Sequence, residues 1–464
     1  MRKVLTSAVA LLTGTAAFVA FGVSPASAKT TVTNYFPNAL TIQCPVGDTT
    51  VAPASGDTDT CTSGDSSAVA ITYGGADFDN NFVPYVVTAF GKAGNDPSNN
   101  AGWFANAYAD KNSLTGRELA IGYGGVGPTG GQGAIGFTDI PLGLDTQASP
   151  TDATMLSAES ETASQLVQVP ITLGGVAIIY NINFTADAPK LCAKKYAKHG
   201  LILSGENLGQ IFNGVITTWD NAALLTTNAD LEVNAGTSAS PDNVNCLSYL
   251  TDESITDEVR TADSGTSYVL TTYLNDVDPT DFPAATSTMP VGVTNKGSAV
   301  LAPAVASTNG AIGYVESSYA AINKLQTARL INAAGDVVKL SNAGVLADAT
   351  KALKSTGSIG SINNFSPTAL ADFSVANQDC RKCYPIAGFS WAIVQQQQND
   401  ASQAIAIAKF LEYLSHGSTG GSYGQSLANG LDYVPLPTAV QVYAQDQIQK
   451  ITYGSDLPAL SNNN

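Results

Sequence analysis

Histidine is nearly absent from this sequence, with only His199 and His416 among 464 residues. A Ser–His–Asp triad requires a histidine beside a nucleophile, and both histidines stand in ordinary helix or loop context, so no catalytic residue is assigned. Neither histidine has zinc-ligand spacing to a cysteine. The sequence therefore predicts a protein that is not an enzyme and that has neither a metal site nor a cofactor.

Positive charge is also scarce. The chain has 21 Lys and Arg against 38 Asp and Glu, which gives a formal net charge of −17. Such a surface repels nucleic acid and anionic lipid, which excludes nucleic acid as a partner. Any anion bound by this chain must therefore be held by local donors, because the global field opposes it.

Long apolar runs are missing except near the N-terminus. There, two basic residues precede an apolar stretch that ends in Ala-Ser-Ala, a pattern typical of a signal peptide over residues 1–28. No cysteine follows residue 28 directly, since the first is Cys44, so a lipid anchor is not expected. No later run is long enough to span a bilayer, so we expect no membrane insertion and a periplasmic or secreted location.

The six cysteines of the chain are few, but their number is even. In an exported protein an even count favours disulfides. The simplest pairing joins neighbours in the sequence: Cys44 with Cys61, Cys192 with Cys246, and Cys380 with Cys383. The last pair lies in "CRKC", which could also be a redox motif. Residues 29–65, rich in Thr, Asp and Gly, are expected to form a disulfide-closed N-terminal extension.

Strand and helix patterns alternate along the rest of the chain, which favours an α/β fold with mostly parallel sheets. The length exceeds that of one ordinary core, so two lobes are expected. Strands are predicted in 66–75, 167–182 and 384–398, and helices in 82–90, 263–274 and 401–417. A helix followed by a turn is predicted in 207–220, and a strand followed by a helix in 309–323. Residues 117–142 are interpreted as a short strand, a Gly-rich stretch and a second short strand that reaches Asp139.

The stretch "RTADSGTSYVL" combines an arginine with small hydroxyl residues at a predicted helix start. Arg260 offers five donors in a rigid fork, Ser264 and Thr266 add hydroxyls, and Gly265 allows a ligand close to the backbone. A helix that begins near Ser264 points free amides and a partial positive charge outward. These are the parts of an oxyanion cradle. The alternative is that Ser264 only caps the helix and that Arg260 forms a surface ion pair.

Two further features suit an anion site less specifically. The Gly-rich stretch 122–131 can curl amides around an anion, but it lacks the lysine of a nucleotide-binding P-loop and is more typical of a plain loop. Asp139, in "FTDIPL", could accept a proton from a hydrogen-bearing oxyanion and repel a fully deprotonated one. Alternatively, Asp139 caps a backbone amide in a turn.

Several stretches together resemble the PstS family, the phosphate-binding proteins of the bacterial high-affinity phosphate ABC transporter. They include "YGGADF" (73–78), "FTDIPL" (137–142), "VPITLGGVAIIYNI" (169–182), "RTADSGTS" (260–267) and "GAIGYVESSYA" (310–320), in the family's order. The resemblance implies a two-lobe periplasmic-binding-protein fold, type II-like, with the ligand cleft between the lobes. It also implies inorganic phosphate as ligand, a membrane ABC permease as partner, and a monomer.

The resemblance further assigns the lobes and the ligand donors. Lobe one would comprise 66–172 and the return segment 384–464, and lobe two 173–383. Phosphate-binding positions would be Arg260, Ser264, Gly265 and Thr266 in lobe two, and Asp77, Phe78, Thr129 and Asp139 in lobe one. Among these, Asp139 matches the carboxylate that accepts the phosphate proton, Phe78 a backbone donor, and Thr129 the loop that supplies a hydroxyl.

This chain departs from the family's pattern in lobe one. Asp77 stands where the family usually has Thr, and Pro128, which has no amide donor, replaces a Ser of the Gly-rich loop. The helix expected after that loop has no room before Asp139. A carboxylate at position 77 weakens anion binding unless it points away or is protonated. Two alternatives therefore stay open: a binding or surface protein with altered or lost phosphate affinity, and a phosphatase on the same frame.

Overall fold

The computed structural model describes residues 40–42, 71–92, 108–146, 148–162, 165–238, 240–355, 374–398, 401–416, 424–453, 457–458 and 460–462. The predicted signal peptide and the Cys44–Cys61 pair lie outside these residues. Of the predicted extension 29–65, only β1 (Leu40–Ile42) is described, and it pairs antiparallel with β19 (Leu460–Asn462). No helix among the described residues is long and apolar enough to cross a membrane.

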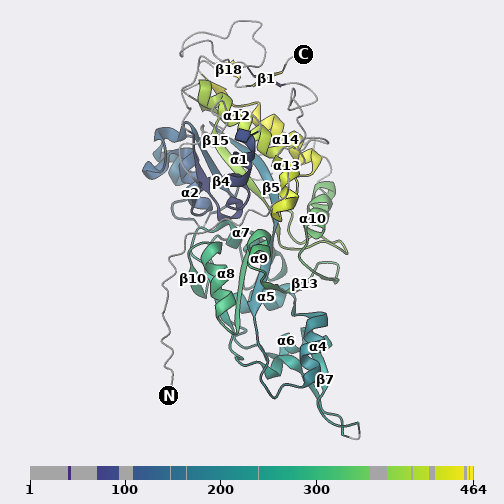
Figure 1. The fold of residues 1–464 in the computed structure, drawn as a ribbon. Coiled ribbons are helices and arrows are strands. Elements are labelled where there is room, and N and C mark those ends of the chain that lie inside the picture. Colours follow the sequence, from purple (N-terminus) through teal and green to yellow (C-terminus); the bar gives the residue numbers. More distant parts are fainter. Residues whose placement is uncertain are drawn as a thin grey trace, which may run out of the picture. The chain divides into compact units, whose positions relative to one another are not determined.

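One mixed sheet organises the fold, and the long strand β5 (Leu166–Asn181) lies at its centre (Figure 1). The strand order is β10-β9-β11-β5-β15-β4-β2-β3. The first part of β5 pairs with β15 (Ala387–Gln395) up to Gly175, and from Val176 onward it pairs with β11 (Ala311–Glu316). A continuous apolar run suits such a strand because both of its faces are buried. The other strands of this sheet are β2 (Thr72–Gly75), β3 (Ala109–Asp110), β4 (Ala134–Thr138), β9 (Thr256–Arg260), β10 (Val293–Asn295) and the short β12 (Gln326–Thr327).

Parallel pairing is confined to the outer strands of this sheet. β2 is parallel to β3 and β4, and β9 is parallel to β10 and β11. β5 is antiparallel to β15, β11 and β12, and β15 is antiparallel to β4. The expectation of mostly parallel sheets is therefore wrong for the centre. β15 comes from the C-terminal part of the sequence and runs antiparallel to both of its neighbours, β5 and β4.

Helices cover both parts of the sheet, and several match their predicted ranges. Around β2, β4 and β15 lie α1 (Val83–Lys92), α2 (Ser113–Ile121), α3 (Asp152–Ala158), α12 (Ala401–Ser415), α13 (Gly424–Ala428) and α14 (Thr438–Ile448). Around β9 and β11 lie α5 (Gly205–Phe212), α7 (Gly265–Val277), α8 (Ser298–Ser307) and α9 (Ser317–Ile322), whereas α10 (Asn342–Ser355) packs on β5 and β15. Single-turn helices are η1 (Asp77–Asp79), η2 (Tyr123–Gly125), η3 (Thr129–Gly131), η5 (Ala229–Leu231), η6 (Cys246–Tyr249) and η8 (Asn429–Leu431).

The predicted strand at the start of 117–142 is wrong, because these residues belong to helix α2. The side chain of Asn112 accepts a hydrogen bond from the Thr115 amide at 2.8 Å and so caps the helix. Gly122 ends the helix in the left-handed region, with φ 80°. A helix therefore precedes the Gly-rich stretch, which continues as η2 and η3 into β4.

Smaller elements extend the part of the chain that follows β5. They are α4 (Lys190–His199), α6 (Ala222–Thr227), β6 (Ile202–Leu203), β7 (Glu232–Asn234), β8 (Asn243–Asn245), β13 (Arg329–Ile331) and β14 (Val337–Val338). Elsewhere β16 (Gln397–Gln398), β17 (Thr452–Tyr453) and β18 (Leu457–Pro458) form a separate small sheet. The predicted disulfide between Cys192 and Cys246 is confirmed, and it ties α4 to η6.

Candidate functional site

The predicted cradle forms where β9 leads into α7. Arg260 is the last residue of β9, and α7 begins at Gly265 with Ser264 as its N-cap. The Ser264 hydroxyl accepts a hydrogen bond from the Ser267 amide at 3.3 Å. Arg260, Ser264 and Thr266 are each at most 3% exposed. The helix start is thus as predicted, and a surface ion pair for Arg260 is wrong because the guanidinium is buried.

Arg260 is held by hydroxyl and carboxyl groups from four other elements. Its Nη1 donates to Ser298 Oγ at 2.8 Å and to Thr266 Oγ1 at 3.1 Å, and lies 3.6 Å from Glu316 Oε1. Its Nη2 contacts Asp77 Oδ2. Burial lowers the pKa of Arg260, but the surrounding carboxylates, Asp77 first, outweigh that effect and raise it. The guanidinium therefore stays charged.

Asp77 points into this cradle and not away from it. It opens η1, directly after β2, and is 3% exposed. Its Oδ2 contacts Arg260 and also accepts a hydrogen bond from the Ser298 amide at 3.2 Å. That amide is the first of α8, so the carboxylate lies at the positive end of a helix.

Asp139 faces the same region from the end of β4. Its amide donates to Ser113 Oγ at 3.0 Å, and its Oδ1 lies 2.8 Å from Ser390 Oγ. A Cβ on Gly265 would collide with Ser113 Oγ and with the Asp139 carboxylate. Only glycine therefore lets the start of α7 approach the start of α2 so closely.

Asp79 joins this group through Ser390, whose Oγ lies 2.5 Å from Asp79 Oδ2. Burial raises the pKa of Asp79 well above its usual range, and the nearby charge of Asp139 adds to that shift. Burial also raises the pKa of Asp139 to about 8, although Ser390 and Arg260 oppose it. Glu316 is wholly buried as well, and burial raises its pKa. The site therefore holds protons that exposed carboxyls would release at neutral pH.

Most of the predicted site residues lie together, but the Thr129 loop does not. The backbone of η3 packs at the C-terminal end of α2, where Gly131 lies against the Ala120 carbonyl. Ser113 and Asp139 lie at the N-terminal end, about 13 Å away for a nine-residue helix. Phe78 is buried beside Asp77, and its carbonyl accepts a hydrogen bond from Tyr433.

Five contributors were not predicted: Asp79, Ser113, Ser298, Glu316 and Ser390. Ser113 could have been found, because Asn112 and Gly122 are ordinary helix-boundary signals around it. Ser298 follows Gly297, the N-cap of α8, but no helix was predicted there. Glu316 and Ser390 sit inside apolar strand runs, where a lone polar residue signals a buried partner.

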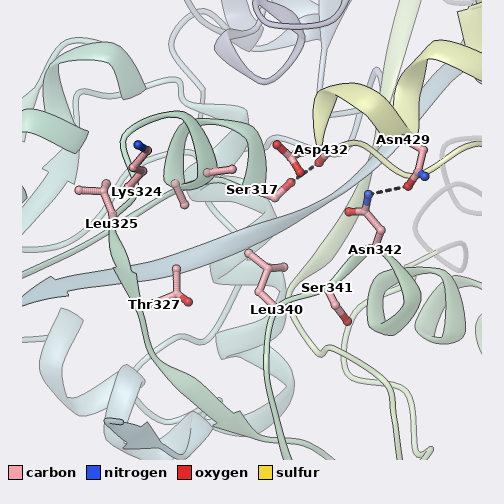
Figure 2. A pocket seen from close by; sticks show the side chains of 11 residues that line it. Ser317, Lys324, Leu325, Thr327, Leu340, Ser341, Asn342, Asn429 and Asp432 are labelled. Atoms are coloured by element: carbon pink, nitrogen blue, oxygen red, sulfur yellow. Dashed lines mark hydrogen bonds between the residues drawn. The ribbon is translucent and has the colours of Figure 1, made fainter. Parts of the chain in front are cut away.

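Two hollows lie near the cradle. One, of about 290 Å³, is bordered by Asp139 and by Tyr268 of α7, with Phe389 and Trp391 of β15. The other, of about 640 Å³, lies beside α9 and includes Lys324. In Figure 2 Ser317 points toward Asp432 across its edge, and the Ser317 hydroxyl donates to the Asp432 carbonyl at 2.7 Å.

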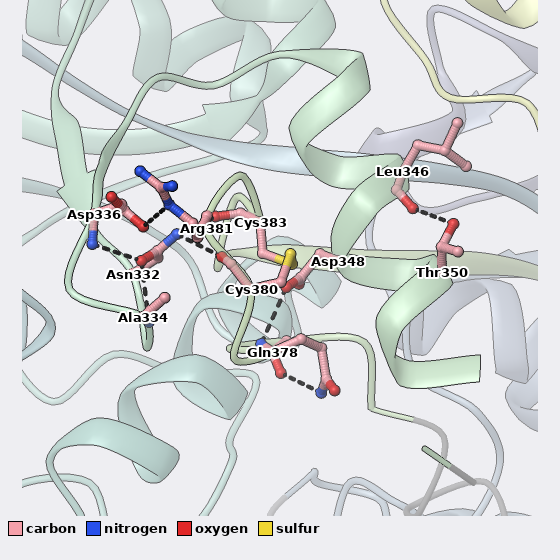
Figure 3. Close-up of a disulfide and its surroundings, with 11 residues drawn as sticks. Asn332, Ala334, Asp336, Leu346, Asp348, Thr350, Gln378, Cys380, Arg381 and Cys383 are labelled. Carbon is pink, nitrogen blue, oxygen red and sulfur yellow. Dashed lines mark hydrogen bonds and ion pairs between the residues drawn. A yellow bond between two sulfur atoms is a disulfide. The ribbon is translucent and has the colours of Figure 1, made fainter. Parts of the chain in front are cut away.

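The "CRKC" segment forms the predicted disulfide between Cys380 and Cys383 (Figure 3). The carbonyls of both cysteines accept hydrogen bonds from the Asn332 side chain, at 2.9 and 3.1 Å. Nearby, the Gln378 amide donates to Asp348 at 3.0 Å, and Cys383 is fully buried. These contacts hold the loop that contains the disulfide against its neighbours, which favours a structural disulfide over a redox-active one.

Buried polar groups from both parts of a mixed α/β sheet thus meet on one arginine. The chain belongs to the PBP superfamily: the family model described as "PBP superfamily domain" matches residues 129–416, more than half of the chain. The family implied by the sequence resemblance is thus confirmed at the level of this superfamily.

Relatives with curated names share this assignment. The "Phosphate-binding protein PstS" of Xylella fastidiosa (strain 9a5c) is 29% identical over 333 residues, which cover 71% of this chain and 77% of the relative. Its namesake in Pasteurella multocida (strain Pm70) is 27% identical over 341 residues, 72% of this chain and 84% of the relative.

Solved structures share the fold. The phosphate-binding protein from Stenotrophomonas maltophilia has a TM-score of 0.52 and 18% identity, and the match covers 82% of this chain and 93% of the other. A high-affinity periplasmic phosphate-binding protein solved with phosphate at pH 8.5 also has a TM-score of 0.52, with 20% identity and the same coverage.

Proposed function

We propose that this protein is an extracytoplasmic oxyanion-binding protein that captures phosphate and delivers it to a membrane ABC permease. The observation that carries the proposal is the buried Arg260, surrounded by hydroxyl groups and by the starts of α7 and α8, and facing Asp139. Buried arginine with helix N-termini is a well-suited anion site. The names of the relatives support phosphate as the ligand.

Each group has a distinct role in this proposal. Arg260 supplies the positive charge, and Thr266 with the first amides of α7 supplies hydrogen bonds. Asp139 accepts a proton from phosphate and disfavours anions that have none to give. Ser113, at the start of α2, takes the place that the resemblance gave to the Thr129 loop, because its hydroxyl touches Asp139.

Hinge motion about the central strands fits this role. We keep the lobes at 66–172 with 384–464 and at 173–383. The partner change along β5, between Gly175 and Val176, supports a boundary close to residue 172. A periplasmic or secreted location and a monomeric state belong to the same proposal. No catalytic step is included.

Calorimetric titration with phosphate and with sulfate tests the proposal. Phosphate should bind and sulfate should be excluded. Arg260→Ala should lose roughly 2–5 kcal/mol of binding free energy, because part of a buried anion would be left unpaired. Arg381→Ala is the matched control, since that side chain is 88% exposed and lies outside the cradle. Binding by Arg260→Ala as tight as by the parent would refute the assignment of the cradle.

Asp139→Asn provides the test of selectivity. An amide cannot accept the phosphate proton with the same strength and does not repel sulfate, so discrimination against sulfate should relax. Selectivity equal to that of the parent would remove Asp139 from the proposed role. A chromogenic phosphomonoester assay tests the phosphatase alternative. Turnover by the parent chain would support a phosphatase.

A further inference from the structure

Asp77 has the surroundings expected of a bound anion. Its carboxylate contacts the Arg260 guanidinium and accepts a hydrogen bond from the first amide of α8 at 3.2 Å. The same guanidinium and the Ser298 hydroxyl are linked at 2.8 Å. A guanidinium and a helix N-terminus are donors that hold an oxyanion.

Asp77 reaches this position from the opposite lobe. It follows β2, in proposed lobe one, whereas Arg260, Ser298 and Glu316 come from β9, α8 and β11 in proposed lobe two. The contact therefore joins the two lobes through a buried pair of opposite charges, each side chain 2% exposed.

Neutral contacts hold the same segment against lobe two. The Asn80 side chain donates to Tyr319 Oη at 3.1 Å, and the Asn81 side chain donates to Ser318 Oγ at 3.2 Å. These bonds do not involve the carboxylate. A substitution at Asp77 alone therefore removes the charged contact between the lobes and leaves these weaker neutral contacts.

We propose that Asp77 is a built-in occupant of the anion cradle, which closes the two lobes without a ligand and which phosphate must displace from Arg260. The identity of the incoming anion rests on the proposed function, whereas the closure of the lobes does not. Two anions cannot share one buried guanidinium without a large cost, so binding becomes an exchange of carboxylate for phosphate. Asp77 thereby lowers affinity and sets the phosphate concentration at which the protein fills.

The test uses the full chain with Asp77→Thr, Asp77→Asn and the control Asp263→Asn. Asp263 lies in the loop between β9 and α7, so its substitution removes one negative charge from the same region without touching Arg260. Circular dichroism confirms that each variant folds. Titration calorimetry measures phosphate affinity, and small-angle X-ray scattering measures the radius of gyration with and without phosphate.

Asp77→Thr should bind phosphate roughly 100-fold more tightly than the parent, because removal of a like charge from a buried site is worth several kcal/mol. Asp77→Asn should gain less, and Asp263→Asn should match the parent. Without phosphate, both Asp77 variants should have a larger radius of gyration than the parent, and phosphate should contract them but not the parent.

Other results overturn the exchange. If the parent binds phosphate and Asp77→Thr binds it no more tightly, Asp77 does not compete with the ligand. If the parent contracts on phosphate as much as the variants do, the carboxylate does not close the lobes. If no variant binds phosphate, sulfate, arsenate or molybdate, the proposed function fails. In that case the radius of gyration without phosphate still tests the closure. A radius in the Asp77 variants equal to that of the parent overturns the closure, and a larger radius supports it.

Discussion

Replacing Asp79 by asparagine should flatten the pH dependence of stability between about pH 4 and 8. The reason lies in Ser390, whose hydroxyl has one hydrogen but lies 2.5 Å from Asp79 Oδ2 and 2.8 Å from Asp139 Oδ1. It can donate to only one of them. The other carboxyl must carry a proton and donate to Ser390, since two lone pairs at that distance repel each other.

The proton belongs on Asp79. Its Oδ1 is buried and has no hydrogen-bond partner among the described residues, whereas Asp139 also contacts Ser113 and feels the charge of Arg260. Burial raises the pKa of both carboxyls, that of Asp139 to about 8 and that of Asp79 well above its usual range. In the unfolded chain both release their protons near pH 4.

The sign and size follow from linkage. Because the folded protein binds more protons than the unfolded chain in this window, the free energy of unfolding is greatest below about pH 4 and falls as the pH rises toward 8. One extra bound proton corresponds to a slope of about 1.4 kcal/mol per pH unit. Asp79→Asn removes that proton, because an amide side chain takes up none in this pH range.

Urea unfolding at pH 5, 6, 7 and 8 measures the effect. The parent should lose stability over this series, and the slope of Asp79→Asn should be smaller by roughly 1.4 kcal/mol per pH unit. Asp242→Asn, at an exposed position directly before β8, is the control and should keep the slope of the parent. A parent whose stability rises from pH 5 to 7, or an Asp79→Asn variant with the parent slope, would refute the shared proton.

Two further predictions concern the start of α2 and the start of α7. Ser113→Ala should weaken phosphate binding roughly 10- to 100-fold, since a hydrogen bond to a charged group is worth about 1.5–3 kcal/mol. Thr129→Ala should leave phosphate binding unchanged. Calorimetry on both variants decides which hydroxyl contributes to the site. Gly265→Ala should destabilise the fold by about 1–3 kcal/mol through collision with Asp139, and an unchanged midpoint in urea would contradict the close approach.

Local patterns were sufficient for the cradle and for much of the fold. The start of α7 could be predicted because Ser264, Gly265 and the apolar spacing after them are all local signals for a helix N-terminus. The run that forms β5 was equally clear, since only a strand buried on both faces is so uniformly apolar. Arg260 then lies in the site because only four residues separate the end of β9 from the start of α7.

The lobe-one side of the site could not be predicted from local sequence patterns. Two stretches of lobe one offer a hydroxyl, one at Ser113 and one at Thr129, and the family resemblance assigned the second. Which of them meets Asp139 depends on the packing of α2 against β4, where Gly116 lies against the Phe137 backbone. The direction of the Asp77 side chain likewise depends on Arg260, 183 residues later.

The charge balance of the site restricts what it can bind. Four carboxyls, Asp77, Asp79, Asp139 and Glu316, are buried around the Arg260 guanidinium, so full ionisation would leave several unpaired charges. The site is stable only if some carboxyls keep their protons, as the raised pKa values indicate. An incoming anion must then replace the Asp77 carboxylate and also bring a proton for Asp139. Phosphate can do both at neutral pH, whereas sulfate, which carries no proton there, can only do the first.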